Sequence, residues 1–135
     1  MQVKLKNAYL QQITGLLFDL VLKGKQSRHR TKLITLLEER YKEVEEQRVQ
    51  LAKEHSHLDE DDKPVTKNGS FDIIDFAEFK KELNDLLQEE MVIGGGDCEL
   101  MLNTMKEALL ECEQAFSGKE ALIYDYLCDQ FERED

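Results

Sequence analysis

Residues 27–58 read SRHRTKLITLLEERYKEVEEQRVQLAKEHSHL, and this stretch decides the expected fold because it indicates one long helix. Its apolar positions recur every seven residues, at Leu37, Val44, Leu51 and Leu58. The second heptad column is polar and holds Arg40, Gln47 and Glu54. A single apolar column makes a poor coiled coil on its own. We therefore expect the helix to rest one stripe on a neighbouring helix and to leave its distal half solvated, where a partner could bind.

The residues before this stretch predict the neighbouring helix and complete a long N-terminal helical hairpin. Residues 2–6 alternate polar and apolar side chains, which predicts a short strand with Val3 and Leu5 on one face. Asn7 is a suitable cap for the helix that follows. The apolar residues of that helix recur at helical spacing, at Leu10, Ile13, Leu17, Leu20 and Val21. Gly24 lies just past them, in the left-handed position that ends many helices.

The residues after the long helix predict a short β-hairpin and one more strand. The acidic run at residues 59–62 ends the helix. Asn68-Gly69 is the strongest short signal for a two-residue hairpin turn, because both residues tolerate positive φ. Residues 91–93 form a brief apolar run, which predicts a strand beside the one at residues 2–6.

Three further helices are expected in the C-terminal part. Asp75 and Glu78 form a capping pair for the first of them, with Ile74 as a hydrophobic staple. Its buried face is expected at Phe76, Phe79, Leu83, Leu86 and Leu87. Asp97 is expected to cap the next helix. The inward side chains of that helix are Leu102, Met105, Leu109 and Cys112. Residues 117–120 match a capping box and start the last helix. Its inward side chains are Leu122, Tyr126, Leu127 and Phe131.

These elements predict a fold that is mainly α with minor β (α+β). A chain of 135 residues is expected to form one domain, here residues 1–135. Its successive parts are the strand with the helical hairpin (1–58), the acidic loop with the β-hairpin (59–72), and the helical C-terminal part (73–135).

The charge of the chain is polarised along the sequence. The net charge is −11, but residues 1–32 carry +6 and residues 33–135 carry −17. A strongly acidic body repels nucleic acid, so direct binding to DNA or RNA is disfavoured. No run of 18 apolar residues occurs, so no membrane span is expected.

Three local patterns could support chemistry, and each has a simpler structural explanation. His55 and His57 lie beside the acidic run, but on a helix they point about 200° apart, so they cannot share a metal unless the helix has already ended. Residues 94–96 are three glycines that could cradle a phosphate, yet the lysine of a P-loop is missing. Cys98, Cys112 and Cys128 are an odd number without CxxC spacing, which is typical of free thiols in a reducing compartment. We therefore expect no catalytic residue, cofactor or metal.

Several short motifs match those of one protein family. They are residues 3–8 (VKLKNA), 22–28 (LKGKQSR), 43–48 (EVEEQR), the acidic loop before Asn68-Gly69, 116–120 (FSGKE), 124–125 (YD) and 131–132 (FE). On these motifs, the chain resembles a family of small proteins of unknown function encoded by phages and prophages of Gram-positive bacteria, over nearly its whole length. The resemblance implies a phage origin and the cytoplasm of a bacterial host as the location. It carries over no active-site residue.

The leading functional hypothesis is a non-enzymatic protein–protein interaction module of a phage, such as an accessory of virion or tail assembly. It would bind a protein of phage or host origin, or a second copy of itself as a homo-oligomer. One candidate partner-binding site is basic and comprises Lys23, Lys25, Arg28, Arg30 and Lys32. These cations could instead be solvated or paired with acidic residues of the same chain.

The other candidate site is acidic and half apolar, and comprises Leu37, Glu38, Glu39, Val44, Glu45, Glu46 and Leu51. The alternative function is an acidic inhibitor of a host enzyme that acts on nucleic acid or in defence, that is, an anti-defence protein. Its negative surface would occupy the nucleic-acid-binding groove of that enzyme.

Overall fold

The computed structural model describes residues 1–133. The elements follow in the order β1 (Gln2–Lys6), the 3-10 helix η1 (Asn7–Tyr9), α1 (Leu10–Asp19), α2 (Gly24–Glu54), β2 (Thr66–Lys67), β3 (Ser70–Phe71), α3 (Phe76–Gln88), β4 (Glu90–Gly94), α4 (Cys98–Leu110) and α5 (Gly118–Glu132). Within these residues the two sheets are small, antiparallel and two-stranded, and the rest of the regular structure is helical. The predicted class, mainly α with minor β, is therefore confirmed.

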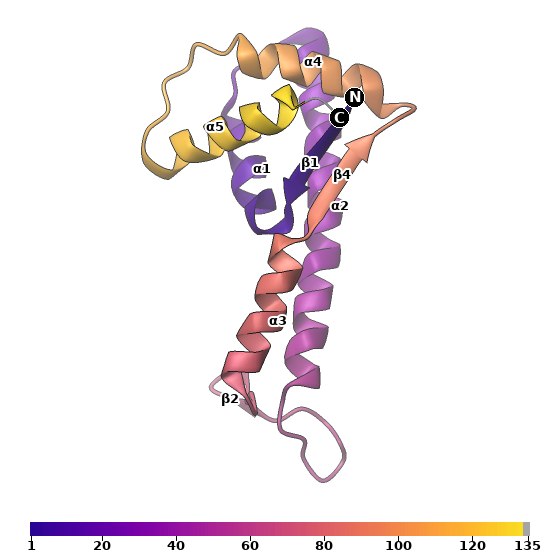
Figure 1. Ribbon diagram of the computed structural model, residues 1–135, viewed down its shortest axis with the longest axis vertical. Helices are drawn as coiled ribbons and strands as arrows, with labels where there is room; N and C mark the ends of the chain where they lie inside the picture. The colour runs from indigo at the N-terminus through magenta and orange to yellow at the C-terminus, as the bar shows by residue number, and fades with distance from the viewer. Residues whose placement is uncertain (134–135) are drawn as a thin grey trace.

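The long predicted helix is present as α2 and forms the axis of the molecule (Figure 1). Its 31 residues extend over about 46 Å at the usual rise of about 1.5 Å per residue. α2 begins at Gly24 and not near Ser27, and it ends at Glu54 and not near Leu58. The earlier end has a tertiary cause, because Ser56 and Leu58 pair with Ile73 and Pro64 in isolated β-bridges.

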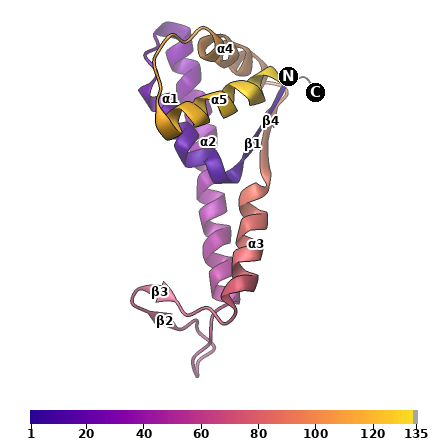
Figure 2. The same ribbon diagram turned by 60° about the vertical axis from the view of Figure 1, so that its left-hand side comes forward.

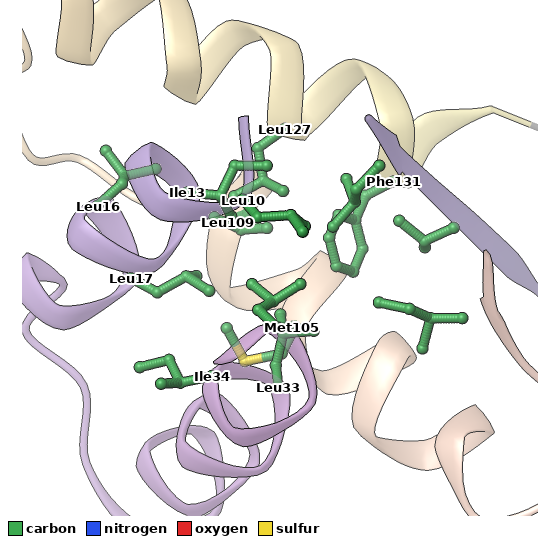
Figure 3. Close-up of a cluster of buried hydrophobic side chains, with 14 of the residues drawn as sticks. Leu10, Ile13, Leu16, Leu17, Leu33, Ile34, Met105, Leu109, Leu127 and Phe131 are labelled. Carbon is green, nitrogen blue, oxygen red and sulfur yellow. The ribbon is translucent and has the colours of Figure 1, made fainter. Parts of the chain in front are cut away.

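One end of α2 is surrounded by the other elements, and we call this part the body. It consists of the N-terminal half of α2 together with α1, α4, α5, β1 and β4 (Figure 1). Its fully buried side chains come from all of the helices of the body, as Figure 3 shows for Leu10, Leu17, Leu33, Leu109 and Phe131. In the part of the chain that the structure describes, no helix combines the length and the apolar character needed to cross a lipid bilayer.

β1 and β4 form the sheet of the body. They pair antiparallel, with Val3 opposite Ile93 and Leu5 opposite Met91. Val3, Leu5 and Ile93 are buried, so one face of this sheet covers the core. The strand predicted at residues 91–93 and its position beside β1 are both confirmed.

The other half of α2 extends away from the body and is joined by α3 alone among the helices; we call this part the arm (Figures 1 and 2). The arm also includes residues 55–75, which connect the two helices. The distal half of α2 is therefore not solvated as expected. Ala52 of α2 and Phe79 of α3 are buried in this contact. The apolar face that covers α2 comes from a segment far along the chain, so the heptad pattern by itself gave no sign of it.

The β-hairpin at Asn68-Gly69 is confirmed. β2 and β3 pair antiparallel, with Lys67 opposite Ser70, and φ is +52° at Asn68 and +81° at Gly69. Two successive positive φ values are those of the type I′ turn that this dipeptide favours. The hairpin projects from the side of the arm near its end (Figure 2).

The expected helix caps are only partly confirmed. Asp75 caps α3, since its Oδ1 accepts a hydrogen bond of 3.1 Å from the Glu78 amide. Asp97 and Ser117 precede α4 and α5 as predicted, but neither side chain makes a capping hydrogen bond. Asn7 does not cap a helix either. Its side chain is buried and bonds to residues of α2 and α3, which are more distant in the sequence.

Several side chains predicted to face inward are exposed. They are Val21, Phe76 and Leu122, and the expected staple Ile74 is exposed as well. α1 ends at Asp19, so Val21 lies in the linker to α2 and not on a helical face. Gly24 has the predicted left-handed φ, +59°, but it stands at the start of α2 and not at the end of α1. Cys112 lies just past the end of α4 and is half buried.

Candidate partner-binding site at the end of the arm

The end of the arm is a hydrogen-bonded structure and not a loose loop. The His57 amide donates to the Asp72 carbonyl at 2.9 Å, and the Val65 amide donates to the His57 carbonyl at 2.8 Å. The Ile74 amide donates to the His55 carbonyl at 2.8 Å, which joins the start of the connection to its end. On the side chains, His55 Nε2 lies 2.6 Å from Glu82 Oε2 and links the end of α2 to α3. These bonds hold the side chains of this region in defined positions.

Three large apolar side chains are exposed at this end of the arm. The exposed fractions are 55% for Leu58, 62% for Ile74 and 61% for Phe76, and we call these three residues the arm-end patch. Leu58, Pro64 and Ile74 share the wall of a surface hollow of about 440 Å³. Grouped apolar side chains on a surface commonly mark an interaction site, whereas single ones do not.

An acidic loop, residues 59–62, borders the arm-end patch. Asp59 shapes the loop, because its Oδ1 accepts hydrogen bonds from the amides of Asp61 (2.9 Å) and Lys63 (3.0 Å). The other three side chains, Glu60, Asp61 and Asp62, are exposed and make no ion pair within residues 1–133. The apolar patch therefore lies next to uncompensated negative charge.

The predicted basic site at residues 23–32 is divided by the structure. Arg30 Nη1 donates to the Leu17 carbonyl at 3.2 Å and also to the Leu20 carbonyl, so it caps the end of α1. Lys32 Nζ donates to the Asp97 carbonyl at 2.9 Å, at the start of α4. These two cations thus serve the fold.

Lys23, Lys25 and Arg28 remain exposed, and among the described residues they form no ion pair. Phe18, near the end of α1, is 64% exposed, and Val21, in the linker between α1 and α2, is 85% exposed. We call these five residues the body patch. Val21 is held in place by Gln114, whose Oε1 accepts from the Val21 amide at 2.9 Å.

The pKa of His29 is affected by cations of the body patch. It is half buried, and its Nδ1 has no hydrogen-bond partner in the described part of the chain. Burial lowers the pKa of His29, and the charges of Lys25, Arg28 and Lys32 lower it further. The surroundings of this imidazole are therefore positive.

The comparison with known families adds one finding. A family model for proteins of unknown function, DUF1617, matches residues 1–135. The chain belongs to the DUF1617 family. Neither the curated proteins nor the solved structures include a match to this DUF1617 protein. The family description assigns no activity.

The predicted acidic and half-apolar site on α2 of this DUF1617 chain does not exist as one surface. Leu37 and Val44 are buried and Leu51 is half buried, so the apolar members belong to the interior. Glu38, Glu39 and Glu46 are exposed, whereas Glu45 is bound by Arg48, whose Nη2 lies 2.9 Å from Glu45 Oε2. The apolar residues predicted for this site pack against other elements of the same chain, so they are not available to a partner.

The three cysteines of the chain all lie in its C-terminal helical part. Cys98, Cys112 and Cys128 are free and half buried. Burial raises the pKa of the Cys128 thiol, although a hydrogen bond with Tyr124 opposes this effect. A protonated thiol is a weak nucleophile. Within residues 1–133 no three His, Cys, Asp or Glu side chains come together in a group that could hold a metal ion.

The exposure of apolar residues at the end of the arm was not predicted from the sequence. Leu58 was counted in the heptad column, Ile74 as a staple and Phe76 as part of a buried face. The available signal was the position of these apolar residues on either side of an acidic run that ends a helix.

Proposed function

We propose that this chain is a non-enzymatic protein-binding module that holds a protein partner at the end of its arm. One observation carries the proposal: Leu58, Ile74 and Phe76 are each more than half exposed, together, on an arm that extends away from the body. Burying such a side chain completely contributes roughly 1.5–3 kcal/mol. A partner that covers the three would therefore gain a large part of the free energy needed for specific binding.

The charge beside the arm-end patch specifies the chemistry of the partner. Glu60, Asp61 and Asp62 are exposed, Lys63 follows them directly in the sequence, and Lys80 Nζ lies 5.6 Å from the centre of the Phe76 ring. A complementary surface presents apolar side chains next to basic ones. Such charge pairs at the edge of an interface mainly speed association and select the partner.

The biological setting of the proposal follows from the motifs shared with phage and prophage proteins. We propose a phage origin in a Gram-positive bacterium, action in the host cytoplasm, and a role as an accessory of virion or tail assembly. Mass spectrometry of cells during the lytic cycle tests this setting. Detection of the chain together with the structural proteins of a phage would support it.

Affinity capture from phage-infected cells tests the proposal. The full-length protein is compared with the arm variant Leu58→Ser/Ile74→Ser/Phe76→Ser and with the matched control Val92→Ser/Leu122→Ser, which changes two exposed residues of the body. We expect the wild type and the control to retain the same protein, and the arm variant to bind it at least about tenfold more weakly. Equal retention by all three proteins would exclude the arm end as the binding site.

A second candidate function rests on the outer side of α2, where Glu38, Glu39 and Glu46 are exposed. In this case the chain inhibits a host enzyme that acts on nucleic acid, by presenting negative charge to its binding groove. Binding to a host nuclease should then weaken strongly when the salt concentration is raised from about 0.05 to about 0.5 M, because the Debye length falls from roughly 14 to roughly 4 Å. The variant Glu38→Lys/Glu39→Lys/Glu46→Lys should lose this binding, whereas the arm variant should keep it.

A further inference from the structure

The partner surface that the arm end requires is present on the chain itself. The body patch combines two exposed apolar side chains, Phe18 and Val21, with the exposed cations Lys23, Lys25 and Arg28. The lowered pKa of His29 has Lys25 and Arg28 among its causes, in agreement with a positive potential there. The body patch is thus apolar and basic, while the arm end is apolar and acidic.

The two patches cannot meet within one molecule. The body patch surrounds the start of α2 at Gly24, and the arm-end patch lies beyond its end at Glu54. The helix between them is about 46 Å long at the usual rise of about 1.5 Å per residue. Contact between the patches therefore requires two copies of the chain.

We infer that the arm end of one copy docks on the body patch of a second copy. This inference rests on the proposed function and identifies the partner as the chain itself. In the contact, Glu60, Asp61 and Asp62 of one copy face Lys23, Lys25 and Arg28 of the other. The apolar side chains of the two patches cover one another.

The hollow beside Val21 supports the same pairing. It measures about 490 Å³ and is lined by Val21, Leu22 and Ala108, with Glu111 and Glu113 also in its wall. The apolar lining can receive a side chain of the arm-end patch. The two glutamates are matched by Lys53 and Lys63 at the arm end.

The net charge of −11 does not prevent this association. At physiological ionic strength charges more than about 8 Å apart are largely screened. In the inferred contact, the opposite charges of the two patches lie within this distance of one another. Raising the salt concentration should therefore weaken the association.

The contact joins two different surfaces, so it allows more than one assembly. Two antiparallel copies can each place the arm end on the body patch of the other and close as a dimer with two equal contacts. Where the geometry does not close in this way, further copies add to the free arm end and the free body patch and form a ring or an open row. In each case the mean mass rises above that of one chain as the protein concentration increases.

The experiment compares the mass of the full-length protein and two blocked variants by sedimentation velocity over a concentration series. The body-blocked variant is Lys23→Glu/Lys25→Glu/Arg28→Glu. The arm-blocked variant is Glu60→Lys/Asp61→Lys, which leaves Asp62 unchanged because its φ is +59°. The five side chains that are changed are all exposed. Circular dichroism checks that the helix content of each variant equals that of the wild type.

We expect the wild-type mass to rise above that of a monomer with concentration, and each blocked variant to associate at least about tenfold more weakly. Mixing the two variants pairs the intact arm end of one with the intact body patch of the other, and the two charge-reversed patches are complementary as well. The mixture should therefore associate although neither variant associates with itself. Combining both changes in one chain should restore association with itself, because the charges are exchanged.

Three results would overturn the inference. They are a wild-type protein that is monomeric at every concentration, a body-blocked variant that still dimerises, and a mixture that does not associate. A monomeric wild type whose arm variant loses a captured protein would leave the proposed function standing with a different partner. Failure of both experiments would remove the proposed function as well.

Discussion

Arg40 of α2 donates a hydrogen bond of 3.0 Å from its Nε to Oδ1 of Asn7, where the arm meets the body. Asn7 also donates from Nδ2 to the Leu86 carbonyl at 2.9 Å and from its amide to the Glu89 carbonyl at 2.9 Å. This buried asparagine therefore joins the end of β1 to both helices of the arm. This arrangement determines the direction in which the arm leaves the body.

Replacing Asn7 with leucine should destabilise the protein by about 1–3 kcal/mol, because the Leu86 carbonyl and the Arg40 side chain lose a buried partner. Urea denaturation followed by circular dichroism measures the change in the free energy of unfolding. The variant Arg40→Leu and the double variant complete a cycle, whose coupling energy should exceed about 0.5 kcal/mol. A single variant within experimental error of the wild type would show that this junction is not structurally important.

Phe131 and Leu122 test how well helical spacing identifies the core. Both lie on α5 and both were expected to face inward, but Phe131 is fully buried and Leu122 is 69% exposed. Phe131→Ala should cost about 3–5 kcal/mol of stability because it leaves a cavity in the body. Leu122→Ala should change stability by less than about 0.5 kcal/mol. Thermal and urea denaturation of the two variants give the comparison directly, and equal losses would contradict the assigned orientation of α5.

Two glycines should respond in opposite directions to replacement with alanine. Gly15 lies within α1, and a Cβ atom there would meet nothing within 4 Å. Gly15→Ala should therefore stabilise the protein by about 0.5–1 kcal/mol, the usual difference between the two residues in a helix. Gly24 has a φ of +59°, so Gly24→Ala should destabilise by about 1 kcal/mol or more. Melting temperatures measured at one protein concentration would reveal a wrong sign in either variant.

His29 should make stability depend on pH. Its pKa is lowered in the folded protein by burial and then by Lys25, Arg28 and Lys32. The unfolded chain, whose histidines have a pKa of about 6.5, binds the proton more readily. The contribution of His29 is therefore fully retained above about pH 6.5 and is lost as the pH falls below it towards the lowered folded pKa.

The measurement is the free energy of unfolding at pH 7.5 and at pH 5.5, for the wild type and for His29→Gln. The decrease between the two pH values should be smaller in the variant. Titration of the imidazole by NMR provides an independent reading, in which the folded His29 should titrate below its ordinary pKa. An unchanged pH dependence in His29→Gln, or a raised pKa, would show that the cations around this residue do not act as inferred.

The sequence alone was sufficient for features that depend on neighbouring residues. The turn at Asn68-Gly69 depends on two residues that accept positive φ, and the cap of α3 depends on Asp75 three residues before Glu78. The presence of one long helix follows from a long stretch without glycine or proline, although both of its ends differ from the prediction. The pairing of β1 with β4 was also predicted, from the apolar residues of the two short strands, although it joins distant parts of the chain. For the turn and the cap, the controlling interactions lie within a few residues or involve an unusual local conformation.

Tertiary contacts decided which of the predicted surfaces exist. The apolar column of α2 indicated a buried stripe, but only the packing of α3 revealed that Val44 and its neighbours are covered while Leu58 is exposed. Likewise, Arg30 and Lys32 were indistinguishable from Lys23 and Lys25 until carbonyl groups of α1 and of residue 97 were found to bind them. A helical repeat specifies which side chains share a face, because it depends on the rise and turn of one helix. Whether that face is buried depends on a partner helix that is brought there by the rest of the chain.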